Sequence, residues 1–184
     1  LQKIKKNYLM HKPLKLRASI ATLIEEGLEF YDEKLDKEII SMSENVKAKG
    51  FATLKDLEKI SYWKSPRAHH HIQKNINKTI KDITGEVLNS NSDLINLSLL
   101  LLLHGVSYPT ASAFLHFCHE LDYPIIDFRA MWSVGFDDQP KYTPELWIDY
   151  VLLTRKISKR YQIDKRTLDR ALWGYSKKYQ TIRD

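Results

Sequence analysis

The stretch LLHGVSYPTASAFL, residues 102–115, decides the fold that we expect for this chain. It is apolar up to Gly105, where a residue without a Cβ allows the backbone to turn sharply. Pro109 and Thr110 then suit the start of a helix, because proline lacks an N–H that would be unsatisfied there in any case. The small residues 111–113 allow that helix to pack closely. The stretch therefore predicts two helices joined by a tight hairpin.

Helices are also expected on both sides of this hairpin. Apolar residues recur with a period near 3.6 along most of the chain, and no alternating pattern typical of strands stands out. We therefore predict an all-α fold with a helix-hairpin-helix motif. It forms either a single helical domain over residues 1–184 or two lobes that share a cleft. The predicted helices cover 18–31, 33–48, 54–60, 64–85, 89–103, 109–121, 127–134, 142–161 and 164–179.

Several helix ends are marked by capping residues. Gly50 is expected to end one helix in a left-handed conformation. Thr53 is expected to begin the next, with Asp56 three residues later completing a capping box. Ser65 and the proline after it are expected to open a helix that runs to Gly85.

The composition narrows the class of protein. The single cysteine, Cys118, excludes an internal disulfide framework and a four-cysteine iron–sulfur cluster, and it fits a reducing compartment. The longest apolar run, 97–103, is far shorter than the roughly 20 residues that span a bilayer, and no signal-peptide pattern is found. We therefore predict a cytoplasmic monomer that does not bind a membrane.

Basic residues gather at the two ends of the chain and acidic residues in its middle. Residues 1–17 hold six bases and no acid, and residues 151–184 hold ten bases against three acids. Residues 93–150 hold eight acids against two bases. A basic stripe attracts a polyanion through counterion release, whereas a solvated helix face explains the same charges without a partner. Charge alone favours the solvated helix face.

Two groups of histidines are candidates for a metal site. His69–His71 are consecutive, and on a helix consecutive side chains point about 100° apart, so they chelate a single ion poorly. We expect them on the surface. His116 and His119 share a helical face, but zinc would need further ligands that the sequence does not supply. The alternative for this pair is a set of partly buried polar groups.

The hairpin resembles that of the helix-hairpin-helix DNA glycosylases, the endonuclease III-like (HhH-GPD) superfamily. The family pattern is roughly Leu-Pro-Gly-Val-Gly, three further residues and Ala, and here the matching residues are 103–111. In the family a Pro-Val-Asp segment follows, and here the segment PIID ends in Asp127 at the matching place. The stretches YWKSPR and RTLDRALWGYSK look like those of a bacterial branch of this superfamily.

The resemblance implies a chemistry. The family flips an altered base out of duplex DNA and breaks its N-glycosidic bond through an oxocarbenium-like sugar, which a carboxylate stabilises. Asp127 matches that carboxylate, and the structural alternative is an N-cap of the following helix. Pro109 stands where bifunctional members carry a lysine nucleophile, so a monofunctional glycosylase is expected. Ser107 replaces the second glycine of the hairpin.

Further site residues follow from the resemblance. The residues expected to contact DNA are Gly105, Val106, Ser107, Tyr108, Thr110, Arg129 and Lys64. Trp63 and Tyr108 are expected to line the base pocket, because bases stack on aromatic rings. The alternative for Trp63 is a place in the core, and the alternative for Lys64 is an ordinary place on the surface. Family hairpin carbonyls often bind Na⁺ or K⁺, and those of Leu101, Leu103 and Val106 match. No other cofactor is expected.

Two other functions remain open on the sequence. One is a helix-hairpin-helix module that binds double-stranded DNA and has lost catalysis, which the absent lysine and cluster cysteines favour. The other is a helical adaptor that binds only proteins, which explains the helices but neither the hairpin nor the spacing of Asp127. The dependence of DNA binding on salt separates the adaptor from the DNA-binding proteins.

Overall fold

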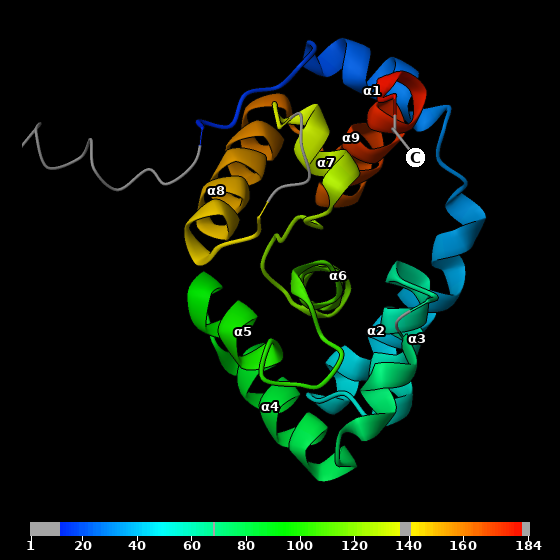
Figure 1. Cartoon of the computed structure of the whole chain (residues 1–184), viewed down its shortest axis with the longest axis vertical. Coiled ribbons are helices and arrows are strands. Elements are labelled where there is room, and N and C mark those ends of the chain that lie inside the picture. Colours follow the sequence, from blue (N-terminus) through cyan, green and yellow to red (C-terminus); the bar gives the residue numbers. More distant parts are fainter. Residues whose placement is uncertain (1–11, 68, 137–140, 182–184) are drawn as a thin grey trace, which may run out of the picture. The chain divides into compact units, whose positions relative to one another are not determined.

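The structure is a computed structural model that describes residues 12–67, 69–136 and 141–181 (Figure 1). All the regular secondary structure in these residues is helical, which confirms the predicted all-α fold. The α-helices are α1 (Ile20–Leu28), α2 (Lys37–Lys49), α3 (Leu54–Lys64), α4 (Asn77–Asn89), α5 (Asp93–Leu100), α6 (Tyr108–Cys118), α7 (Phe128–Ser133), α8 (Pro144–Tyr161) and α9 (Lys165–Tyr179). Two 3₁₀ helices, η2 (Glu33–Asp36) and η3 (His69–Lys74), complete the set. None of the helices described has the length and hydropathy needed to cross a membrane.

The chain divides into two compact units. Of the residues described, unit 1 combines 12–31 with 127–136 and 141–181, and unit 2 comprises 32–67 and 69–126. Among the described helices, α1, α7, α8 and α9 therefore belong to unit 1, and η2 to α6 belong to unit 2.

The helix ends predicted at Gly50 and Thr53 are confirmed. Gly50 ends α2 in the left-handed conformation, with φ of +73°. Thr53 accepts a hydrogen bond from the backbone N–H of Asp56, whose carboxylate accepts one from the backbone N–H of Thr53. Asp164 accepts from the first backbone N–H groups of α9. These ends follow the sequence closely because each cap depends on residues within one helical turn.

The single helix predicted over 64–85 is wrong. Ser65 is the C-cap of α3, and the chain then forms the 3₁₀ helix η3 before α4 begins at Asn77. The side chain of Asn75 donates to the carbonyl of Ile72 and so ends η3. Gly85 does not stop α4, because buried residues before and after it keep the helix packed through to Asn89.

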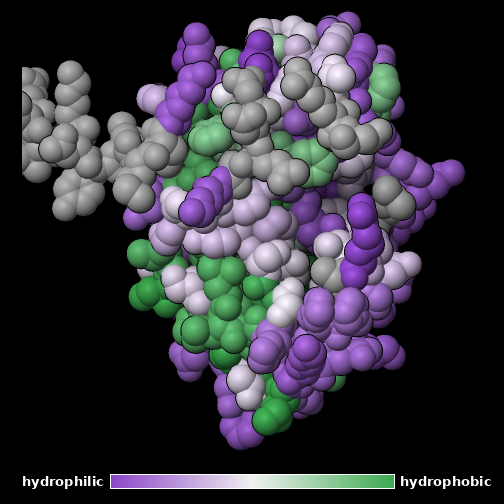
Figure 2. Space-filling model, viewed as in Figure 1, coloured by the Kyte–Doolittle hydropathy of each residue, from purple (hydrophilic) through white to green (hydrophobic). Residues whose placement is uncertain are grey.

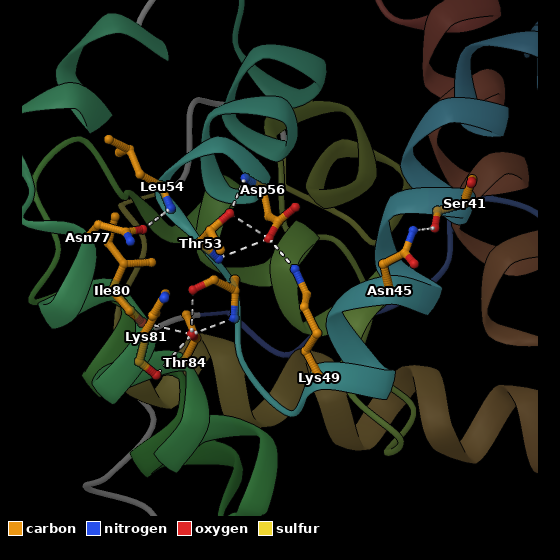
Figure 3. A network of polar contacts seen from close by, with 11 residues as sticks. Ser41, Asn45, Lys49, Thr53, Leu54, Asp56, Asn77, Ile80, Lys81 and Thr84 are labelled. Atoms are coloured by element: carbon orange, nitrogen blue, oxygen red, sulfur yellow. Dashed lines mark hydrogen bonds and ion pairs between the residues drawn. The ribbon is translucent and has the colours of Figure 1, made fainter.

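Unit 2 is built around α6, in which every side chain from Thr110 to Cys118 is buried. A polar network, drawn in Figure 3, fastens the turn between α2 and α3 to α4. Thr84 Oγ1 accepts from the N–H of Ala52 at 2.9 Å, and Asn77 Oδ1 accepts from the N–H of Leu54 at 2.8 Å. These bonds satisfy backbone donors that would otherwise be unpaired at the start of α3.

Unit 1 is held together by the crossing of α1 and α9. The two helices approach so closely at Gly27 and Gly174 that a Cβ on Gly174 would lie 2.8 Å from the carbonyl carbon of Gly27. The fully buried Trp147 and Tyr150 of α8 fill the core of this unit. Two glycines at one crossing therefore let the backbones meet where larger side chains would hold them apart.

Candidate functional site

A tight turn joins α5 to α6, as the sequence predicts; residues 101–107 are called the Gly105 turn below. The backbone N–H of Leu103 donates to Leu100 at 3.1 Å, and that of Val106 donates to Leu103 at 3.2 Å. Gly105 has φ of +75°, a conformation that side chains with a Cβ rarely adopt. Helix α5 thus ends in successive i to i+3 bonds, and α6 begins after a left-handed residue.

Helix η3 supports the Gly105 turn from outside it, and sequence reasoning missed this contact. The side chain of Asn75 donates to the carbonyl of His104 and accepts from its N–H, both at 2.8 Å. A Cβ on Gly105 would lie 2.7 Å from the Cβ of His71. The turn therefore has little freedom to move away from η3. No local pattern marks Asn75, which lies 29 residues before its partner.

The predicted DNA-contacting residues of the turn differ in exposure. Ser107 is exposed at the N-terminus of α6, where its side chain makes no capping hydrogen bond, and Tyr108 is half-buried. The side chains of Val106 and Thr110 are 8% and 2% exposed, so they pack into unit 2, and any contact with DNA is left to their backbone atoms. Of the carbonyls matched to a cation site, that of Leu103 already accepts from Val106.

Cationic groups lie on the η3 side of the Gly105 turn. The rings of His70 and His71 are 4.0 Å apart, and both side chains are exposed. The charge of His70, then burial, and then the charges of Lys74 and His104 hold the pKa of His71 below its usual 6.5. Positive charge that lowers the affinity of His71 for a proton marks a surface that a nearby anion would stabilise.

The α5 side of the turn is apolar instead. Figure 2 shows a hydrophobic patch over α5, and the exposed apolar residues there are Leu94, Ile95 and Leu102. Within α5 the charged residue is Asp93, in its first turn. Positive charge near the turn is therefore supplied by η3 and not by α5.

Trp63 and Lys64 lie at the end of α3. The indole of Trp63 packs edge-on against Phe117 of α6, with ring centroids 5.0 Å apart. Lys64 is the last residue of α3 and is half-buried. The contact with α6 fits the core interpretation of Trp63, and its predicted place in a base pocket remains a prediction.

Asp127 is the N-cap of α7. Its Oδ1 accepts from the backbone N–H of Ala130 at 2.8 Å, and the residue is only 7% exposed. The structural alternative raised by the sequence is thus confirmed. A carboxylate has four lone-pair positions, so one capping bond leaves it capacity for other partners.

Two tyrosines of unit 1 belong to the surroundings of Asp127, and sequence reasoning missed both. Burial raises the pKa of Tyr142, and the negative charge of Asp127 raises it further. Burial raises the pKa of Tyr150 well above its usual value, as do the charges of Asp169, Asp127 and Tyr142. The signal for Tyr150 in the sequence is its place on the apolar face of α8, three residues after Trp147.

Arg129 lies among aromatic rings. Its guanidinium carbon is 5.1 Å from the ring centre of Phe128 and 5.3 Å from that of Trp173. Burial lowers the pKa of Arg129, and the charge of Asp127 opposes that change. Arg166 of α9 forms an ion pair with Asp169 and donates to the hydroxyl of Tyr31 at 2.5 Å. Arg170 also lies over Tyr31, with its guanidinium carbon 5.5 Å from the ring centre, so cations and aromatic rings alternate along this side of α9.

His116 and His119 have structural roles. His116 Nδ1 donates to the carbonyl of Tyr123 at 2.6 Å, and His119 Nε2 lies 3.2 Å from the carbonyl of Val87. Both residues are 2% exposed. Over residues 12–67, 69–136 and 141–181, no group of three or more His, Cys, Asp or Glu side chains is arranged to hold a metal ion.

In comparisons with protein-family models, curated proteins and solved structures, nothing matches this chain.

Proposed function

We propose that this protein binds double-stranded DNA through the Gly105 turn and releases an altered base by hydrolysing its N-glycosidic bond. In that reaction a water oxygen bonds to the anomeric carbon of the sugar, and the base leaves with the bonding electrons and takes up a proton. The absence of a lysine at Pro109 argues for hydrolysis without a lyase step.

DNA binding is proposed because the Gly105 turn combines an exposed helix N-terminus with positive charge beside it. Helix α6 starts there with an exposed Ser107 that makes no side-chain cap, and the N–H groups of a helix N-terminus favour phosphate oxygens. Lys74 adds positive charge beside the turn, close enough to His71 to lower the pKa of that imidazole. Contacts of this kind bind the phosphate backbone and carry no base sequence.

The chemical part of the proposal depends on Asp127. The bond to Ala130 holds its carboxylate in one orientation, and its low exposure keeps it away from bulk water. A fixed carboxylate stabilises the positive charge that develops on the sugar, or it accepts a proton from the attacking water.

The second candidate is a DNA-binding module without catalysis. It is favoured by the capping bond of Asp127, which by itself accounts for an aspartate at the start of α7. In this case the Gly105 turn keeps its role, and base release is absent.

A base-release screen tests the proposal. Duplex oligonucleotides that each carry one altered base are incubated with the protein, and alkali then cleaves the strand wherever a base has been lost. The variant Asp127→Asn is the matched control, because asparagine caps helices as well as aspartate and only the charge is lost. We expect release by the wild type and none by the variant, with DNA affinity within a few-fold.

No release on a broad panel, with salt-dependent DNA binding intact, would favour the second candidate. Absence of DNA binding at low salt would refute both, because each depends on contacts with phosphates.

A further inference from the structure

Three aromatic rings follow one another in unit 1, where α7 packs against α9 (Figure 1). The ring of Tyr175 contacts that of Trp132, with ring centroids 6.2 Å apart, and that of Tyr179, with ring centroids 4.7 Å apart. Tyr175 and Tyr179 are four residues apart in α9, so they share one face of that helix. The rings of Trp132, Tyr175 and Tyr179 are called the aromatic row below.

The aromatic row reaches the surface of unit 1. Tyr179 is 47% exposed, and Trp132 and Tyr175 are half-buried. Phe30, just after α1, is also exposed, and Lys178 Nζ lies 5.6 Å from its ring centre and 5.2 Å from that of Tyr179. Aromatic surface that several elements contribute marks a binding surface more often than a single exposed ring does.

An extended segment brings a cation to the α7 end of the row. The backbone N–H of Lys15 donates to the carbonyl of Val134 at 2.9 Å, and that of Arg17 donates to Ser133 at 3.0 Å. The guanidinium carbon of Arg17 lies 4.4 Å from the ring centre of Trp132, and its Nε donates to the carbonyl of the same residue. These contacts hold the exposed Arg17 beside the row.

The charges around the row are mostly positive. It is built from residues 12–17, 20–31, 128–136 and 175–181, which together hold six bases and three acids. All three acids belong to α1 or its end, and one of them, Glu26, forms an ion pair with Lys178 at 2.8 Å. Residues 1–17, which precede α1 in the sequence, carry six bases and no acid. A partner that combines flat rings with negative charge complements this surface.

Single-stranded nucleic acid combines these two properties. Its bases stack on aromatic side chains, and its phosphates pair with lysine and arginine. A duplex keeps its bases stacked on one another, so it offers the row only phosphates. A proline-rich peptide also packs on exposed aromatic rings, but it carries no phosphates for the bases of residues 12–17.

We propose that the aromatic row binds single-stranded DNA, with bases on its rings and phosphates at Arg17 and Lys15. Only the choice of DNA over RNA rests on the proposed function. The row is separate from the surroundings of Asp127. Trp173, which contacts Arg129, lies two residues before Tyr175 and therefore points about 200° away from it around α9.

Fluorescence anisotropy with labelled oligo(dT) of about 12 nucleotides tests the proposal. Tyr179→Ala removes the most exposed ring of the row, so it is expected to weaken binding about fivefold or more, as the loss of one base-stacking ring does. Tyr179→Phe keeps the ring and removes the hydroxyl that binds Glu26, so it is expected to bind oligo(dT) as the wild type does. Circular dichroism checks that each variant is folded.

The matched control is Tyr161→Ala. Tyr161 ends α8 in the same unit, is 48% exposed, and its ring centre lies 5.5 Å from the guanidinium carbon of Arg160. It resembles Tyr179 in exposure and in having a cation beside it, but it is not part of the row, so binding of oligo(dT) is expected to stay unchanged.

Salt dependence separates contacts with phosphates from contacts with bases. Arg17→Gln is expected to reduce the slope of log affinity for oligo(dT) against log salt concentration by about 0.7, the value for one phosphate contact on a single strand. Tyr179→Ala is expected to leave that slope unchanged, because a tyrosine ring releases no counterion.

The proposal is overturned if oligo(dT) does not bind, if Tyr161→Ala and Tyr179→Ala weaken its binding equally, or if Tyr179→Ala weakens duplex binding as much. Tighter binding of oligo(U), or of a proline-rich peptide, would overturn the choice of single-stranded DNA. Base release from duplexes without binding of oligo(dT) would refute the role of the aromatic row alone. Binding of oligo(dT) that depends on Tyr179, in a protein that releases no base, would support the row and refute the glycosylase.

Discussion

Replacing Gly174 by alanine tests the packing of unit 1. Gly174 lies inside α9, where alanine is about 1 kcal/mol more favourable than glycine by helix propensity alone. At this position, however, the new Cβ would lie 2.8 Å from the carbonyl carbon of Gly27 and 3.3 Å from its Cα. The obstacle is the backbone of α1, which cannot rotate aside as a side chain can.

The clash is expected to outweigh the gain in helix propensity. Overpacking costs about 1–3 kcal/mol, and a backbone obstacle places Gly174→Ala at the upper end of that range. The net loss in the free energy of unfolding is then about 2 kcal/mol, once the propensity gain of about 1 kcal/mol is included. For a chain of this size, that loss lowers Tm by about 4–8 °C.

Gly85→Ala is the matched control. Gly85 lies inside α4, and the nearest atom to its added Cβ is the carbonyl oxygen of Gly50 at 3.7 Å, an ordinary contact. This variant is expected to gain about 0.5–1 kcal/mol. Both are measured by urea unfolding, with circular dichroism and with tryptophan fluorescence. Fluorescence reports mainly on unit 1, because three of the four tryptophans lie there. A Gly174→Ala protein that is as stable as the control would refute the close crossing of α1 and α9.

Three other predictions follow from the structure. The buried hydroxyl of Tyr150 has no hydrogen-bond partner among the described residues, whereas that of Tyr123 accepts from Asn96 Nδ2 at 3.1 Å. Tyr150→Phe is expected to keep or raise the free energy of unfolding, by up to about 1–3 kcal/mol, whereas Tyr123→Phe is expected to lower it by about 1 kcal/mol. Urea unfolding of both variants checks this. A Tyr150→Phe protein that is less stable than the wild type would show that the hydroxyl has a structural partner. Ser107→Glu is expected to weaken binding to all DNA sequences about equally, because it adds a negative charge at the start of α6. Fluorescence anisotropy with duplexes of unrelated sequence measures this. An unchanged affinity would show that the Gly105 turn is not part of the DNA interface. Because its pKa is lowered, the His71 imidazole binds a proton less tightly in the folded protein than in the unfolded chain. Protonation of His71 therefore lowers the free energy of unfolding, and this loss develops as the pH falls from 6.5 to the lowered pKa. NMR titration of His71 checks this, with Lys74→Gln moving the pKa back toward 6.5, and a His71 that titrates at its usual value in both proteins would contradict it.

The features that the sequence determined by itself are local. The capping box of Thr53, the left-handed end of α2 at Gly50 and the turn at Gly105 each depend on residues within a few positions of one another. The period of the apolar residues was enough to predict an all-α chain, because each helix needs one continuous buried face. The capping position of Asp127 belongs to the same group, since its partner is three residues away.

The tertiary structure decided whatever depends on residues that are far apart in the chain. Asn75 supports the Gly105 turn across 29 residues, and nothing around Asn75 distinguishes it from any other polar residue at the end of a short helix. Gly174 lies inside α9 and Gly27 in the last turn of α1; helix propensity counts a glycine inside a helix as a weak point, and only the contact between the two shows why a side chain would not fit. The unpartnered hydroxyl of Tyr150 is likewise invisible in a sequence, where a buried tyrosine and its missing partner look like an ordinary core aromatic. Local chemistry determines where a helix begins and ends, but which backbone or hydroxyl faces it depends on how the whole chain packs.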